Sequence, residues 1–228
     1  EQMAKVSVKN HRNALRNPYA QSPLKLTVDD VRKSEMVATP LTRLDICAMS
    51  DGAAVCLLAN ERGIKKIERA SLLEAKPVKI IGIGSGIDAM RMADRPHYSY
   101  DEFYNSYALP VEKTYETREY YKKLWERGFR YPGVHSFRAG RMAAKQAYEM
   151  ANIFNPLELD FIELHDAYTS SEIQTYEDMG LCKYGEGGGF VDGGNTFMPN
   201  IDYGLDFKDV QGMMPVNPSG GLLACGHP

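Results

Sequence analysis

The chain has 228 residues, of which 43% are apolar and 25% are charged, and its formal net charge is −3. This composition is typical of a globular protein, and it lacks the basic surplus that a nucleic-acid interface needs. No apolar run reaches the roughly 18 residues of a membrane-spanning helix, so we expect no membrane span.

The cysteines are scattered along the sequence, without the paired spacing of a zinc site or a disulfide framework. They are Cys47, Cys56, Cys182 and Cys225. We therefore expect a reduced, cytoplasmic chain with no metal site and no disulfide. Both ends of the sequence look cut, so a targeting peptide upstream is not excluded.

The first 16 residues predict an amphipathic helix, with lysines and arginines on its polar face. Ala4, Val8 and Leu15 share the apolar face, and the Asn-Pro pair that follows ends the helix. Farther along, Thr27 is typical of a helix N-cap, so we expect a short helix to begin there.

Two apolar segments are expected to form regular structure. Residues 50–59 run from a small-residue turn into an apolar stretch that is either a buried strand or a buried helix. β-Branched residues predict a strand at 78–84, and we place a domain boundary between residues 75 and 76. The glycines of 82–86 lack the spacing of a dinucleotide-binding loop, which disfavours NAD binding. Before these segments, residues 36–44 are expected to be irregular.

Residues 94–132 form an unusual region with eight tyrosines and one tryptophan. A helix is expected at 114–127 and loop elsewhere, so the region predicts a long insert on the scaffold. Tyrosines combine an apolar face with a polar tip. They would line a bulky ligand pocket or form a protein interface, and we favour the interface.

The last part of the sequence alternates helix and strand, which predicts α/β architecture. Helices are expected at 137–153, with Ser136 as its N-cap, and at 169–179, with Gly180 as its C-cap. A strand is expected at 159–164. A glycine-rich loop is expected at 184–211, and the residues after it are dense in turn signals.

Two histidines stand where chemistry is expected. His165 follows the end of the predicted strand at 159–164, and sites in α/β proteins gather at strand ends. His227 follows a run with several glycines, which permit close backbone approach, and Pro228 holds it in extended geometry. For each, the alternative is an imidazole with a purely structural role.

The segments 164–180 and 216–228 strongly resemble the thiolase superfamily, most closely its sterol-carrier-protein and archaeal branches. His165-Asp-Ala-Tyr168 matches one active-site loop, and Gly226-His227-Pro228 matches another. The resemblance implies an α/β thiolase fold with layered αβαβα architecture and two similar halves. Residues 1–75 would end the first half, and residues 76–228 would form the second, with the insert at 94–132.

The resemblance also implies an acyl-CoA acyltransferase that makes or cleaves a β-ketoacyl-CoA through a Cys acyl-enzyme. His227 would activate the cysteine, and His165 would complete an oxyanion hole with it. Tyr168 and Gly226 would contact the substrate. Coenzyme A would be a substrate rather than a bound cofactor, and Cys47, Ala48 and Met49 would line its channel. The loops that carry the nucleophile and the second catalytic cysteine are not in this sequence.

Two other functions fit the same resemblance. One is a thiolase-like retro-aldolase that cleaves a hydroxyacyl-CoA without a nucleophilic cysteine, and the other is a non-catalytic binding subunit. The expected partners are a second copy of the chain, in a dimer or higher oligomer, and a small zinc and OB-fold subunit. The acyl chain that is handled does not follow from the sequence.

Overall fold

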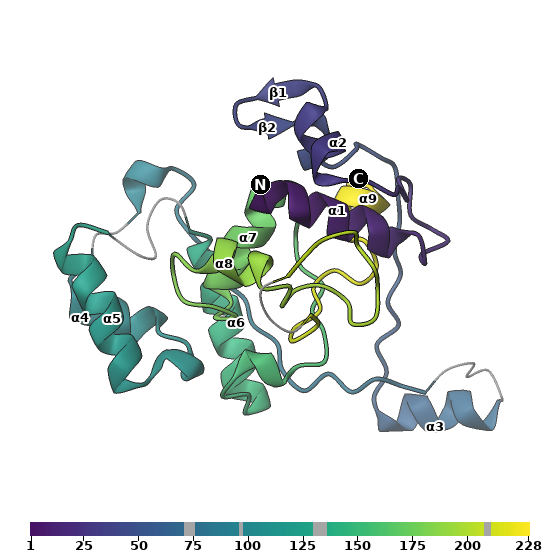
Figure 1. The fold of residues 1–228 in the computed structure, drawn as a ribbon. Helices are drawn as coiled ribbons and strands as arrows, with labels where there is room; N and C mark the ends of the chain where they lie inside the picture. Colours follow the sequence, from purple (N-terminus) through teal and green to yellow (C-terminus); the bar gives the residue numbers. More distant parts are fainter. Residues whose placement is uncertain (71–75, 96–97, 130–135, 208–210) are drawn as a thin grey trace.

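The computed structural model describes residues 1–70, 76–95, 98–129, 136–207 and 211–228 (Figure 1). Helix α1 lies at the centre and contacts α2, α7, α8 and α9. The α-helices are α1 (Gln2–Ala14), α2 (Val28–Lys33), α3 (Glu61–Arg69), α4 (Tyr100–Tyr107), α5 (Tyr115–Glu126), α6 (Arg138–Ala151), α7 (Thr169–Asp178), α8 (Gly187–Asp192) and α9 (Gly221–Cys225). Short 3₁₀ turns are η1 (Arg43–Asp45), η2 (Met92–Asp94), η3 (Pro110–Glu112) and η4 (Pro156–Glu158).

The predicted first helix is present as α1, but its polar face is not a solvent face. Lys9 is completely buried, whereas Leu15 is 44% exposed. Because α2, α7, α8 and α9 all pack around α1, its burial does not follow a single stripe. The main core forms here, from Ala4, Val6, Val8, Val31, Tyr176, Leu181, Val191, Phe197, Tyr203, Met214 and Val216.

The second helix begins at the predicted N-cap. Thr27 and Asp30 form a reciprocal capping box, so the prediction is confirmed. The irregular segment predicted after it is instead a small antiparallel hairpin of β1 (Met36–Ala38) and β2 (Leu41–Thr42). Thr42 holds the hairpin on α2, because its hydroxyl donates to the carbonyl oxygen of Val31 at 2.9 Å.

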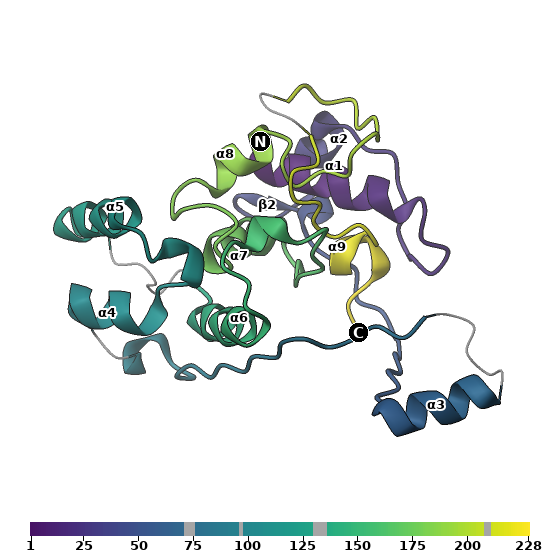
Figure 2. The ribbon, with the colours of Figure 1, turned by 90° about the horizontal axis from the view of Figure 1, so that it is seen from below.

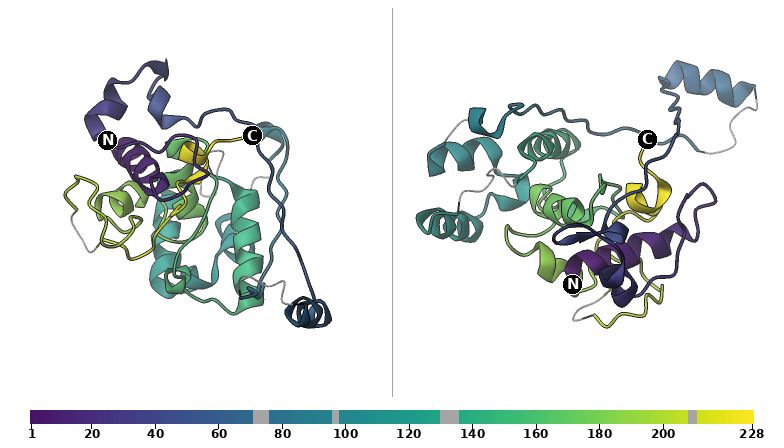
Figure 3. Two further views of the ribbon diagram at one scale, coloured as in Figure 1. Left: turned by 90° about the vertical axis from the view of Figure 1, so that its right-hand side faces the viewer. Right: turned by 90° about the horizontal axis from the view of Figure 1, so that it is seen from above.

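Two predictions are wrong here, namely that residues 50–59 are buried and that residues 78–84 form a strand. Residues 50–59 and 78–84 are extended, neither is assigned as a strand, and Val55 and Val78 are 88% and 92% exposed. They lead into and away from α3, which has no buried residue and stands apart from the rest (Figure 3). No strand of the described ranges pairs with either segment. The boundary at 75/76 stays a prediction, since residue 75 is outside the described ranges.

The segment with the glycine cluster, residues 82–86, runs along α6 (Figure 2). A Cβ on Gly82, Gly84 or Gly86 would lie 2.4, 1.8 or 2.0 Å from a carbonyl oxygen of that helix. These oxygens belong to Ala147, Ala143 and Ala139. Two residues of extended chain advance about 6.6 Å, and four residues of helix advance about 6 Å. Every second residue of segment 82–86 therefore meets every fourth residue of α6.

Replacing Gly84 by alanine is expected to lower the free energy of unfolding by about 1–3 kcal/mol, because the methyl group meets the backbone of α6. Gly140→Ala is the control, because Gly140 lies within α6 itself and has room for a methyl group. Its Cβ would lie 3.7 Å from its nearest neighbour, so stability should stay equal or rise by up to about 1 kcal/mol. Urea unfolding measures both, and equal stability of the two variants would contradict the packing role of Gly84.

The tyrosine-rich insert is a helical hairpin of α4 and α5. The helix predicted at 114–127 is confirmed as α5, whereas α4 lies where loop was predicted. Phe103 stacks on Trp125 with ring centroids 5.6 Å apart. The insert is joined to α6 by a buried ion pair of Glu112 with Arg141, and Tyr121 donates to the other oxygen of Glu112 at 2.8 Å.

In the last part of the chain, α6 and α7 confirm the predicted helices, and a left-handed Gly180 follows α7. The N-cap of α6 is Phe137 rather than Ser136, and the Asp178 carboxylate accepts from the Phe137 N–H at 2.8 Å. The predicted strand at 159–164 is reduced to one bridge, between Ile162 and Val216.

The glycine-rich segment predicted as loop, residues 184–211, contains α8, and its residues 208–210 lie outside the described ranges.

None of the helices in the described ranges has the length and hydropathy to cross a bilayer.

Candidate active site

A short extended segment, residues 46–50, joins the two loops that carry the predicted histidines. The N–H of Cys47 donates to the Ala167 carbonyl at 3.0 Å. On the other side, the His227 N–H donates to Ala48 at 3.0 Å, and the Ser50 N–H donates to His227 at 3.1 Å. Three stretches of chain that are distant in sequence are thus held together by main-chain hydrogen bonds.

The two imidazoles lie next to each other. The ring centroids of His165 and His227 are 5.4 Å apart, with an interplanar angle of 82°. His165 is exposed and His227 is half-buried. Each ring lines a surface hollow, of about 360 Å³ for His165 and about 510 Å³ for His227. Reagents that enter from solvent can therefore reach both rings.

One contact indicates the tautomer of the neutral His227 ring. Nδ1 lies 3.0 Å from the carbonyl oxygen of Pro228. A carbonyl oxygen only accepts, so this contact assigns the proton to Nδ1. Nε2 is then left with its lone pair, and it can take a proton from a neighbouring thiol.

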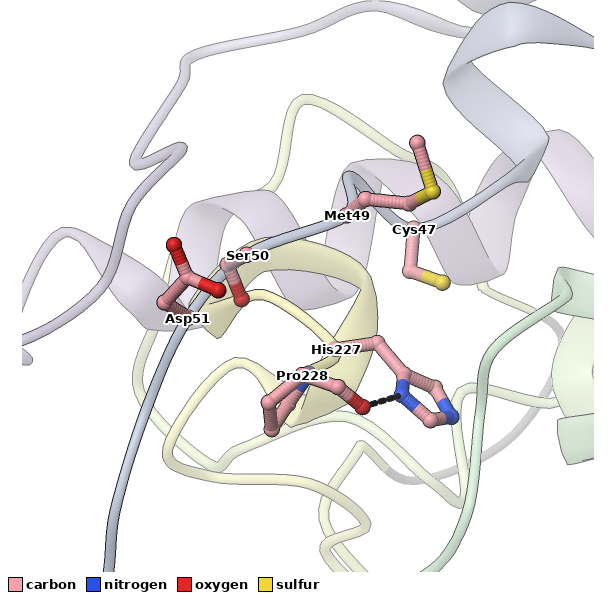
Figure 4. Close-up of a pocket in the computed structure, with 6 residues that line it drawn as sticks. All are labelled: Cys47, Met49, Ser50, Asp51, His227 and Pro228. Atoms are coloured by element: carbon pink, nitrogen blue, oxygen red, sulfur yellow. Dashed lines mark hydrogen bonds between the residues drawn. The ribbon is translucent and has the colours of Figure 1, made fainter.

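The hollow beside His227 contains two of the residues predicted to line a coenzyme A channel (Figure 4). Cys47 points toward the imidazole in this view, whereas Met49 points away from it and is 93% exposed. Ala48 takes part through its carbonyl group. The wall is completed by Ser50, Asp51 and Pro228.

The cysteines nearest the imidazoles are not poised as thiolates. Burial raises the pKa of the Cys47 thiol, and the charge of Asp166 raises it further. Burial also raises the pKa of Cys225, whose thiol donates to the Ser219 carbonyl at 3.2 Å. A reactive cysteine needs a lowered pKa instead.

Within the described ranges, no cluster of three His, Cys, Asp or Glu side chains could hold a metal.

The two residues predicted to contact substrate have backbone roles in the structure. Tyr168 precedes α7 and forms a bridge with Ile46, and its side chain is 44% exposed. Gly226 is buried, and a Cβ on it would lie 2.4 Å from the Ser50 hydroxyl. It lets the loop of His227 approach residues 46–50. Contact of either residue with a substrate stays a prediction.

Beneath the imidazoles lies a buried polar network that the sequence analysis missed. Lys9 forms an ion pair with Glu172 at 2.7 Å, and both side chains are completely buried. Asn10 donates to Glu172 at 2.6 Å and to Asp166 at 2.7 Å. Asn217 also donates to Glu172, at 2.8 Å. Periodicity places Lys9 on a solvent face, so no pattern of spacing reveals the network.

Comparisons with known proteins agree on one family. The model for the thiolase C-terminal domain-like family matches residues 130–228. Sterol carrier protein 2 of Oryctolagus cuniculus is 32% identical over 228 residues, which are the whole of this chain and 32% of that protein. Acetyl-CoA acetyltransferase of Methanothermobacter thermautotrophicus is 33% identical over 229 residues, and 45% of it is covered. The chain thus spans a third to just under half of these curated relatives.

Two further relatives extend the comparison. The benzoylsuccinyl-CoA thiolase subunit BbsB of Thauera aromatica is 30% identical over the whole chain and is covered to 45%. Among solved structures, one titled Ltp2-ChsH2(DUF35) aldolase is 21% identical, covers 97% of this chain, and has a TM-score of 0.62. The chain therefore shares the fold of the matching 45% of that structure. The family match over residues 130–228 and the relatives that align with the whole chain are consistent with a thiolase-superfamily chain.

Proposed function

We propose that this chain supplies the two imidazoles of an acyltransferase site that makes or cleaves a β-ketoacyl-CoA. The observation that supports the proposal is the pairing of His165 and His227, whose rings lie 5.4 Å apart on loops joined through residues 46–50. At this separation, one nitrogen of each ring can reach the same oxygen atom. A thioester oxygen needs such donors as negative charge develops on it.

In the first step, a cysteine thiol gives its proton to Nε2 of His227, and the thiolate attacks the carbonyl carbon of an acyl-CoA. As the new C–S bond forms, charge moves to the thioester oxygen. The Nε2–H of His227 and a ring nitrogen of His165 donate to that oxygen. The bond to the sulfur of coenzyme A then breaks, this sulfur takes up the proton, and an acyl-enzyme remains.

In the second step, another acyl-CoA gives an α-proton to the second catalytic cysteine, which we place outside this sequence, and the resulting enolate attacks the acyl-enzyme. A C–C bond forms, the bond to the enzyme sulfur breaks, and a β-ketoacyl-CoA leaves. We place the nucleophilic cysteine outside this sequence, because the pKa values of Cys47, Cys182 and Cys225 are all raised by burial, and Cys56 lies on the exposed segment 50–59 that leads to α3. The pantetheine arm of coenzyme A would occupy the hollow of about 510 Å³ beside Cys47 and Met49.

The proposal includes the layered αβαβα architecture with two similar halves and a division at 75/76. It also includes an oligomer and a small zinc and OB-fold partner. The Ltp2-ChsH2(DUF35) aldolase carries a DUF35 component in its name, which supports a partner subunit.

The test is turnover of a short β-ketoacyl-CoA with free coenzyme A by the intact protein, followed by loss of its enolate absorbance. We expect two acyl-CoA products, and a cysteine acyl adduct in the acid-quenched protein by mass spectrometry. Coenzyme A binding without turnover or adduct would instead identify a non-catalytic binding subunit.

The second candidate function is retro-aldol cleavage of a β-hydroxyacyl-CoA, which the fold shared with the aldolase structure favours. This reaction needs no free coenzyme A and leaves no acyl adduct. Incubation with a β-hydroxyacyl-CoA alone therefore separates the two reactions. A carbonyl product together with a shorter acyl-CoA would favour the aldolase.

Substituting His165 by alanine is expected to lower kcat of acyl transfer by about 10²-fold, because one oxyanion donor is lost. KM for the acyl-CoA should change by less than about threefold, since the exposed ring contributes little ground-state binding. Steady-state kinetics measures both constants. A loss confined to KM would contradict the oxyanion role.

A further inference from the structure

Asp166, the residue after His165, is completely buried and binds the first turn of α9. Its Oδ1 accepts from the Leu222 N–H at 2.6 Å, and its Oδ2 accepts from the Leu223 N–H at 3.3 Å. The first N–H groups of a helix have no partner within the helix. Asp166 therefore caps α9 from 56 residues away in the sequence.

The contact is too close for any residue but glycine at the start of α9. Gly221 has a φ of +60°, and a Cβ on it would lie 2.2 Å from Oδ2 of Asp166. This explains one of the glycines that precede His227 in the sequence. The helix then ends at Cys225, two residues before the imidazole.

The carboxylate stands among charged groups from every element around it. Lys9 and Asn10 face it from α1, and Glu172 faces it from α7. The thiols of Cys47 and Cys225 are also close enough for the charge of Asp166 to raise their pKa values. Burial, with Glu172 adding to it, raises the pKa of Asp166 to about 7. An ionised carboxylate is costly at such a place, so its hydrogen bonds to α9 must be well satisfied.

We propose that Asp166 is a positioning residue, which sets the separation of His165 and His227 by holding α9 against the loop of His165. The inference rests on the proposed function and adds the residue that aligns the two imidazoles. One end of the link is the neighbour of His165, and the other is the helix that leads into His227. A shift in the contact moves one ring relative to the other, and a displacement of about 1 Å can cost about 10²-fold in rate.

The test replaces Asp166 by asparagine in the intact protein. An amide group has nearly the same volume, but its NH₂ cannot accept a hydrogen bond. We expect kcat of acyl transfer to fall by about 10- to 100-fold, with KM changed less than about threefold. Hydrogen–deuterium exchange should become at least about tenfold faster in the peptide 221–227. Unchanged kcat would overturn the proposal.

Two further variants keep the test decisive. Gly221→Ala pushes the carboxylate off α9 without altering its charge, and it should reproduce both effects. If Asp166→Asn does not fold, Gly221→Ala alone tests the positioning role of Asp166. Glu177→Gln is the matched control, because Glu177 accepts from the Gly187 N–H at 3.0 Å at the start of α8. It should leave kcat unchanged and speed exchange only within α8.

The outcomes separate the two hypotheses. Unchanged exchange at 221–227 in both Asp166→Asn and Gly221→Ala would overturn the positioning role, whatever happens to turnover. A kcat loss without faster exchange would also overturn it, since it would indicate direct contact with the substrate. If the unmodified protein shows no acyl transfer, the proposed function fails instead, and faster exchange still supports the hold on α9.

Discussion

His227→Ala is expected to lower kcat of acyl transfer by about 10³-fold or more while the fold is retained. The variant loses both the proton acceptor for the thiol and a donor to the thioester oxygen, and each contributes about 10²-fold or more. Because the ring is half-buried, few packing contacts are lost with it. Steady-state kinetics and a urea unfolding curve measure the two effects, and added imidazole should restore part of the activity.

The control for this prediction is Cys225→Ala, two residues earlier in the chain. The Cys225 thiol donates only to Ser219 and accepts only from Asn17 among the described residues, so turnover should stay within a few-fold of the unmodified protein. Loss of all turnover in this variant would identify Cys225 as the nucleophile. Unchanged turnover in His227→Ala would contradict the proposed function.

Lys9→Met is expected to lower the free energy of unfolding by about 3–5 kcal/mol, because Glu172 loses the cation that faces it in the buried network. The ammonium group also donates to the Val216 carbonyl at 2.8 Å, and that acceptor would be left unpaired. Urea unfolding at pH 8 measures the loss. Adding Glu172→Gln should recover part of it, because the uncompensated charge is then removed.

The same network predicts a pH dependence. The pKa of Asp166 is raised from an ordinary 3.8 to about 7, so the folded chain binds a proton more tightly than the unfolded chain. The resulting stability is fully present below about pH 4 and is lost as pH rises through about 7. The defect of Lys9→Met should therefore be smaller at pH 5.5 than at pH 8, and the opposite order would contradict this sign.

An exposed ion pair provides the control for Lys9→Met. Arg118 lies 3.2 Å from Asp101, and these side chains are 49% and 74% exposed. Water screens such a pair, so Arg118→Met should change the free energy of unfolding by less than about 1 kcal/mol. An equal loss in the two variants would show that burial does not decide the effect.

Helices were predicted correctly where local signals, such as an N-cap or a face of small residues, agree with the tertiary packing. Thr27 caps α2, and the small residues of α6 leave room for the glycines of 82–86. The missed helices have two different causes. Ser99 and Glu102 form a capping box for α4, a signal that the sequence contains. By contrast, α8 begins with three glycines, which are poor helix formers, and Glu177 stabilises its start from another part of the chain.

The predicted strands failed for a physical reason. β-Branched residues favour a pleated surface, but a strand also needs a partner for its main-chain groups. No strand in the described ranges pairs with 50–59 or with 78–84, so both remain extended and exposed.

Much of the candidate site follows from its two histidine motifs, which the structure brings together. The buried polar network beneath the two histidines cannot be predicted from the sequence, because it depends on long-range contacts. Lys9 carries no sign of burial in its spacing, and nothing in the sequence pairs Asp166 with Gly221. Such contacts are set by how α1, α7 and α9 converge, and only the folded chain shows this.

The hydrogen bonds of residues 46–50 to the two histidine loops are all made by peptide groups. Peptide groups are the same at every residue except proline, which lacks the N–H. The side chains of Cys47 and Met49 are thus free to vary among related proteins without moving either imidazole. Under the proposed function, substitutions at these two positions are therefore a starting point for redesigning acyl-CoA preference without displacing the imidazoles.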